Sequence, residues 1–123
     1  RSPEEIYHDS HFRMDGMGTL RFVFARAPAC LERLRPGLST GLGDIDWVVP
    51  HQASGLALDS LRLLGWSTDR TLRTIDEYGN CIAASIPLTL HKGIESGQVR
   101  RGDKVLLFGT SAGISIAGMI ITF

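Results

Sequence analysis

Two polar residues, His51 and Asn80, stand where the sequence predicts that a buried strand ends and a helix begins. His51 follows the run 46–50, which is apolar apart from Asp46, and Asn80 lies between Tyr78-Gly79 and an alanine-rich stretch. Ligands of open α/β folds bind at the carboxyl ends of strands, so hydrogen-bonding side chains there are candidates for chemistry. A neutral imidazole and a carboxamide both donate N–H groups, and they could stabilise an oxygen that becomes negatively charged.

Both residues also have an ordinary structural interpretation. His51 could be a core histidine whose hydrogen bonds are satisfied, and Asn80 could be a turn residue after Gly79. Their spacing alone favours this interpretation. The residues on either side of His51 and Asn80 therefore have to distinguish a catalytic role from a structural one.

Three motifs occur in a fixed order around these residues: PHQA at 50–53, YGNCIAASIP at 78–87 and FGTSAG at 108–113. With them, the chain from about Phe12 to Phe123 resembles the C-terminal half of the β-ketoacyl-acyl-carrier-protein synthase III family. Each motif alone would be a weak signal, whereas three in order are a strong one. The resemblance implies that His51 and Asn80 are catalytic.

The resemblance implies an acyltransferase that performs a decarboxylative Claisen condensation. An acyl group on a cysteine is joined to a two-carbon unit from a malonyl thioester, and loss of CO2 leaves an enolate oxygen for His51 and Asn80 to stabilise. We expect His51 to be neutral, with its second ring nitrogen held by a backbone group. The implied substrates are acyl-CoA and malonyl-acyl carrier protein, with neither a cofactor nor a metal.

The resemblance also implies partners. The family carries its nucleophilic cysteine in an N-terminal half that these 123 residues do not include. We therefore expect the N-terminal half of the same enzyme as a partner, a homodimer of full-length chains, and no activity from this chain alone. A truncated, non-catalytic module that binds acyl thioesters or scaffolds a partner is the alternative. A relative with thiolase or polyketide-type chemistry is a third interpretation.

The glycine-rich loop 109–113 is the third candidate site. Small residues let the backbone approach a ligand closely. The resemblance assigns an oxyanion-hole N–H to Ala112, with Gly113 beside it, and we expect Ser54, Thr110 and Ser111 to bind substrate. A plain hairpin loop explains the glycines equally well. A phosphate-binding loop is disfavoured because a strand, not a Lys-Ser/Thr pair and a helix, comes next.

The motifs depart from the pattern of the family at two places. Thr110, Ser111 and Ala112 replace an aromatic residue and glycines, which predicts a different shape for the acyl pocket. Ser54 stands where the family often has asparagine, and no basic residue follows two positions later. How the carrier protein would dock is therefore left open.

Other reactive side chains have simpler interpretations. Cys30 lies within an apolar helical pattern and Cys81 matches no active-site position of the family, so we expect neither to be a nucleophile. His8, Asp9 and His11 lie in a polar segment without further ligands at suitable spacing, and we expect no metal site there.

Composition limits the classes of protein that the chain can belong to. With 123 residues, 43% of them hydrophobic, the chain is long enough for one packed domain. Thirteen basic and thirteen acidic residues give zero net charge, so nucleic acid is not an expected partner. The polar N-terminus lacks a signal core, and the apolar stretch 114–121 is too short to span a bilayer as a helix. We expect a cytoplasmic protein with no membrane partner.

The periodicity of apolar residues predicts the elements that position the motifs. The expected elements are a helix over 20–34 bent at Pro28, a strand over 45–49, a helix over 53–64 capped by Gly65, a weak strand over 71–75, a helix from Ile82 with the core face Ala83, Ile86, Leu90 and Ile94, and a hairpin of strands 104–108 and 114–123. This order predicts a three-layer α/β fold with a mixed sheet and helices on both faces, one half of a thiolase-like fold. Residues 1–11 form a polar N-terminal segment and 12–123 the domain.

Overall fold

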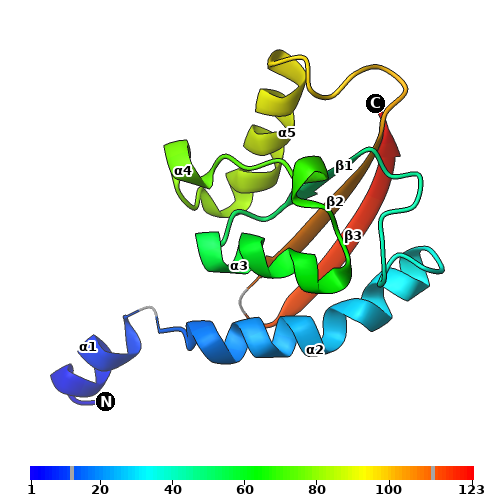
Figure 1. The fold of residues 1–123 in the computed structure, drawn as a ribbon. Coiled ribbons are helices and arrows are strands. Elements are labelled where there is room, and N and C mark those ends of the chain that lie inside the picture. The colour runs from blue at the N-terminus through cyan, green and yellow to red at the C-terminus, as the bar shows by residue number, and fades with distance from the viewer. Residues whose placement is uncertain (12, 112) are drawn as a thin grey trace.

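The computed structural model describes residues 1–11, 13–111 and 113–123. Its elements, which Figure 1 shows in chain order, are α1 (Pro3–Asp9), α2 (Gly16–Leu34), β1 (Trp47–Pro50), α3 (Gly55–Ser60), the 3-10 turns η1 (Leu61–Leu64) and η2 (Thr68–Arg70), α4 (Ile75–Tyr78), η3 (Ile82–Ala84), α5 (Ser85–Glu95), β2 (Lys104–Ser111) and β3 (Ser115–Thr122).

The described strands form one mixed sheet in the order β1-β2-β3. β1 pairs with β2 in parallel, with Trp47 opposite Val105, and β2 pairs with β3 in antiparallel, with Lys104 opposite Thr122. The predicted mixed sheet and the predicted hairpin are both confirmed. A parallel pair requires a long crossover, and here the crossover contains α3, α4 and α5.

Alternate residues of the strands build two apolar layers, one on each face of the sheet. On one face Val48, Leu106 and Phe108 pack with buried residues of α2 and α3. On the other face Val49 and Val105 form a second cluster, against which Ile86, Leu90 and Ile94 of α5 pack. Helices thus cover both faces (Figure 1), and the three-layer α/β arrangement is confirmed.

Helix α5, which follows Asn80 in the chain, buries different residues from those that its apolar pattern predicts. In α5 the fully buried residues are Ser85, Thr89 and Gly93, while Ile86, Leu90 and Ile94 are only partly buried. Ala83 belongs to the 3-10 turn before the helix and is exposed, so its assignment to the core was wrong. At Gly93 there is no room for a side chain, because a Cβ there would lie 2.6 Å from Cδ1 of Leu72.

The N-terminal segment 1–11 contains a helix that the apolar pattern did not predict. α1 begins with a capping box: Ser2 Oγ accepts from the backbone N–H of Glu5 at 3.1 Å, and the Glu5 carboxylate accepts from the N–H of Ser2 at 2.7 Å. Pro3 occupies the first turn, where its missing N–H costs nothing. None of the residues of α1 is buried, which explains why apolar periodicity gave no signal.

The weak strand predicted over 71–75 is reduced to one bridge. Thr71 pairs with Val48, and the N–H of Leu72 donates to Val48 O at 2.9 Å. The N–H groups of Thr74 and Ile75 then donate to the side chain of Gln52 instead of a strand, and α4 begins at Ile75. Asn80 therefore follows a short helix, and the prediction that it follows a strand was wrong.

The hairpin extends further than predicted. β2 continues past Phe108 to Ser111, with Gly109 opposite Ala117 and Ser111 opposite Ser115. Residues 109–111 are thus strand, not loop. Their burial decreases toward the end of the strand, and Ser111 is exposed.

Gly65 ends the helical stretch α3–η1 as predicted, in a left-handed conformation with φ of 71°. A Cβ at this position would lie 2.2 Å from the carbonyl oxygen of Thr40. Gly43 has a similar φ of 57° but open space around the Cβ position. We expect Gly65→Ala to lower the free energy of unfolding by about 2 kcal/mol more than Gly43→Ala, as measured by denaturant unfolding. Equal losses would mean that the close approach to Thr40 carries no energy.

Candidate active site

A cavity of about 600 Å³ lies between α2, α3 and the carboxyl ends of β1 and β2. Its walls are mainly apolar, with Leu20, Val23 and Phe24 of α2 facing Leu58 and Leu61. The polar residues at the cavity are His51, Ser54, Asn80, Thr110 and Ser111, together with Asp15 and Thr19. All described residues that we predicted to be catalytic or substrate-binding therefore line one cavity.

His51 is held at the end of β1 by its backbone. The N–H of His51 donates to Phe108 O at 2.8 Å, which continues the pairing of β1 with β2 by one residue. The side chain is partly buried at the cavity. In the described part of the chain neither ring nitrogen makes a hydrogen bond, in contrast to the backbone partner that we expected.

Burial lowers the pKa of His51 below its ordinary value, because desolvation disfavours the charged imidazolium. The ring is therefore neutral at pH 7, with one N–H donor. We expect an NMR titration of the His51 ring protons to show a midpoint below the ordinary value of about 6.5. Any donor function of the neutral ring should persist as the pH falls to that midpoint and change below it. A midpoint above the ordinary value would contradict this assignment.

Asn80 is oriented by its own side-chain oxygen. Oδ1 accepts from the backbone N–H of Ile82 at 2.9 Å, which forms a turn of the kind asparagine favours. Nδ2 donates to Ala53 O at 3.4 Å, a long contact to the segment that follows His51. The amide carries two hydrogens, and Ala53 O is the one acceptor that the described residues provide.

The other predicted site residues differ in position. The Ser54 hydroxyl caps α3 by accepting from the N–H of Ala57 at 3.1 Å, and the residue also lines the cavity. Thr110 and Ser111 line the cavity from the end of β2. Gly113 is exposed and is not among the residues of the cavity wall. The predicted donor Ala112 lies outside the described residues.

Neither cysteine belongs to the cavity wall. Cys30 is partly buried on α2, and the Cys81 thiol donates to Tyr78 O at 3.4 Å and Gly79 O at 3.9 Å. Among the described residues no group of three or more His, Cys, Asp or Glu side chains could hold a metal ion. None of the described helices is long and apolar enough to cross a membrane.

Gln52, which follows His51, is a residue that sequence reasoning missed. It is completely buried, and its carboxamide contacts the backbone of residues 50, 72, 74 and 75. The available signal was a long polar side chain two residues after a buried strand, where burial is costly unless every hydrogen bond is formed.

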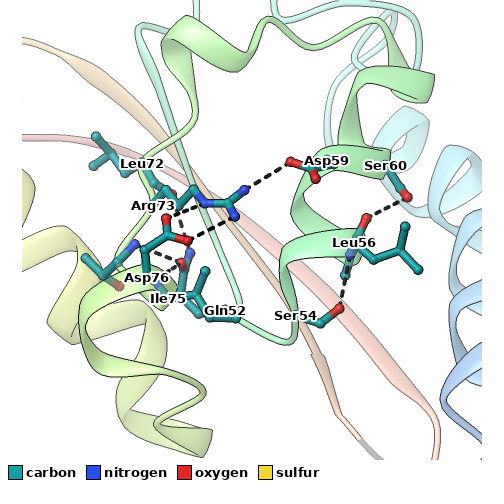
Figure 2. A network of polar contacts seen from close by, with 11 residues as sticks. Gln52, Ser54, Leu56, Asp59, Ser60, Leu72, Arg73, Ile75 and Asp76 are labelled. Atoms are coloured by element: carbon teal, nitrogen blue, oxygen red, sulfur yellow. Dashed lines mark hydrogen bonds and ion pairs between the residues drawn. The ribbon is translucent and has the colours of Figure 1, made fainter.

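A second polar contact, nearer the surface, joins α3 to the segment 73–76. Arg73 donates from Nε and Nη2 to the two carboxylate oxygens of Asp76, at 2.6 and 3.2 Å, and from Nη1 to Asp59 of α3 at 3.0 Å. Figure 2 shows Arg73 between these two carboxylates. The hydrogen bond from Arg73 lowers the pKa of Asp76. α3 and α4 are thus connected by one guanidinium.

Comparison with known proteins gives a consistent answer. Residues 38–123 match the family described as 3-oxoacyl-[acyl-carrier-protein (ACP)] synthase III C terminal. A β-ketoacyl-[acyl-carrier-protein] synthase III from Neisseria meningitidis is 34% identical over 114 residues, which are 92% of this chain and 36% of that protein. The chain therefore spans about a third of the length of the relatives that it matches.

Solved structures share the fold. The 3-oxoacyl-(acyl carrier protein) synthase III of Pseudomonas aeruginosa PAO1 superposes with a TM-score of 0.80 at 31% identity, over 92% of this chain and 36% of that one. The β-ketoacyl-[acyl carrier protein] synthase III of Thermus thermophilus gives 0.78 at 33% identity, over 90% and 35%. The thiolase-like fold predicted from the motifs is confirmed.

Proposed function

The chain belongs to the 3-oxoacyl-[acyl-carrier-protein] synthase III C-terminal family, and from that premise we propose that it supplies the decarboxylating half of a decarboxylative Claisen condensation. In this proposal His51 and Asn80 act together on the malonyl thioester. The observation that carries the proposal is that both side chains line one cavity, although 29 positions separate His51 and Asn80 in the chain.

Two neutral donors suit this reaction. Loss of CO2 places negative charge on the thioester oxygen, and donors that already point at that oxygen stabilise the enolate without reorganisation. The lowered pKa of His51 supports a neutral N–H at working pH. Asn80 does not titrate, and its Oδ1 is already occupied by Ile82, which leaves the NH2 side for the substrate.

The end of the hairpin has a separate role in the proposal. The backbone N–H of Ala112, with Gly113 beside it, would contribute to an oxyanion hole next to the nucleophilic cysteine. Ser54, Thr110 and Ser111 would contact the substrate, and their position on the cavity wall supports that role. The apolar walls from α2 and α3 would receive the thioester arm.

The substrates and partners are proposed from the family. Acyl-CoA would acylate the cysteine and malonyl-acyl carrier protein would be the extender, without a metal or other cofactor. The cysteine would come from an N-terminal half of the complete enzyme, and complete chains would form a homodimer. Met14, Met17 and Leu56 line the cavity and are each more than half exposed, at 58%, 53% and 57%, which supports a further segment that covers them.

The proposal is tested by measuring the two half-reactions of the complete protein separately. We expect acyl transfer from acyl-CoA to a cysteine outside these 123 residues, and CO2 release from malonyl-acyl carrier protein that requires the residues of the cavity described above. Binding of acyl thioesters without either reaction would instead support the non-catalytic module.

A further inference from the structure

The side chain of Gln52 is buried and is hydrogen-bonded to backbone groups of two separate segments. The residue is 0% exposed, and its carboxamide makes four contacts with backbone groups. Nε2 donates to Pro50 O at 3.0 Å and to Leu72 O at 3.4 Å. Oε1 accepts from the N–H groups of Thr74 at 2.9 Å and of Ile75 at 3.1 Å. A carboxamide has two N–H donors and one oxygen that accepts twice, so Gln52 is saturated.

We propose that Gln52 is a positioning residue, which fixes the segment that carries His51 relative to the segment that carries Asn80. The inference rests on the proposed function, because it concerns the geometry of the two donors for one oxygen. Gln52 itself is not among the residues of the cavity wall, so it would act through its neighbours.

The contacts of Gln52 connect two parts of the chain that are far apart in sequence. Its backbone directly follows His51, and its side chain holds Thr74 and Ile75, the start of α4. Figure 2 shows the Gln52 side chain next to Ile75, whose N–H donates to it. α4 leads through Gly79 to Asn80, whose amide returns to Ala53 O. The segment 51–53 and the segment 74–80 are thus joined at two points, by the side chain of Gln52 and by the side chain of Asn80.

The surrounding groups select a carboxamide rather than another side chain. Two carbonyl oxygens require donors, and two N–H groups require an acceptor, all inside the protein where an unpaired group is costly. A glutamate at this position could still accept from Thr74 and Ile75, but an ionised carboxylate has no hydrogen to donate to Pro50 and Leu72. A methionine of similar length would leave all four backbone groups without their partner.

The test uses Gln52→Glu and Gln52→Met in the complete protein, with Thr89→Val as the matched control. Thr89 is also 0% exposed, and it makes a buried hydrogen bond to Ser85 O and a partly buried one with the Thr74 hydroxyl, but it does not hold the backbone of Thr74 or Ile75. We expect both Gln52 variants to lower the kcat of CO2 release by about tenfold or more, since a displacement of about 1 Å can cost that much. Acyl transfer and the KM for the malonyl thioester should change by less than about twofold.

A measurement on the unaltered protein keeps the inference testable if a variant does not fold. The amide hydrogens of Thr74 and Ile75 should exchange slowly with solvent, because a buried side chain accepts them. Fast exchange of both hydrogens would overturn the inference. It would also be overturned if the folded Gln52 variants released CO2 at the unaltered rate, or if Thr89→Val lowered that rate as much as they do.

Failure of the inference and failure of the proposed function give different results. If His51→Ala lowers CO2 release and the Gln52 variants do not, only the inference is wrong. If His51→Ala leaves CO2 release unchanged, the proposed function is wrong. The exchange of the Thr74 and Ile75 hydrogens, compared between the unaltered protein and Gln52→Met, then still reports whether Gln52 holds α4, because methionine removes the acceptor of both hydrogens.

Discussion

His51→Ala should lower CO2 release from the malonyl thioester by about 10²- to 10³-fold in the complete enzyme, while acyl transfer from acyl-CoA to the cysteine is retained. The change removes one of the two N–H donors that we assign to the enolate oxygen, and one such donor is worth about 2.7 to 4 kcal/mol in an oxyanion site. The cavity remains, because His51 is bonded to β2 through its backbone N–H and not through its ring.

His91→Ala is the matched control for this prediction. His91 lies on the exposed side of α5, where Nε2 is 3.3 Å from Glu95, and it is not part of the cavity wall. Its removal should change neither half-reaction. An equal loss of acyl transfer and CO2 release in His51→Ala would contradict the specific role given to the imidazole.

Asn80→Asp should lower CO2 release at least as strongly as Asn80→Ala, although aspartate has nearly the same shape as asparagine. The carboxylate can keep the contact that Oδ1 makes with the N–H of Ile82, so the turn is preserved. It loses both N–H donors of the amide and adds negative charge where we propose that an anion develops. Alanine loses the donor without adding that charge, so the difference between the two variants measures the electrostatic part.

Gln98→Glu provides the control for the added charge. Gln98 is exposed, and its Oε1 contacts Ser96 rather than the cavity. This change of amide to carboxylate should leave the rate of CO2 release unaltered. If Asn80→Asp released CO2 faster than Asn80→Ala, the side chain at position 80 would act as something other than a donor to an anion.

Local patterns of residues were sufficient to predict most of the described elements. The helical spacing of α2, the cap at Gly65 and the two apolar strands of the hairpin depend on neighbours within a few positions, and each was confirmed. The capping box of α1 is equally local, but a helix without buried residues leaves no apolar periodicity in the sequence, and α1 was therefore not predicted.

Motif order and residue periodicity are properties of the linear chain, and they were enough to predict the family, the three-layer fold and the candidates His51 and Asn80. Three further features depend on packing in three dimensions: the segment 71–75 stops pairing after one bridge, Asn80 follows a helix, and Gln52 joins the segments that carry His51 and Asn80. These features depend on contacts between residues that are far apart in the chain, and local sequence patterns do not specify such contacts. A backbone N–H donates to whichever acceptor folding brings near, and for Thr74 that acceptor is the side-chain oxygen of Gln52, 22 residues away.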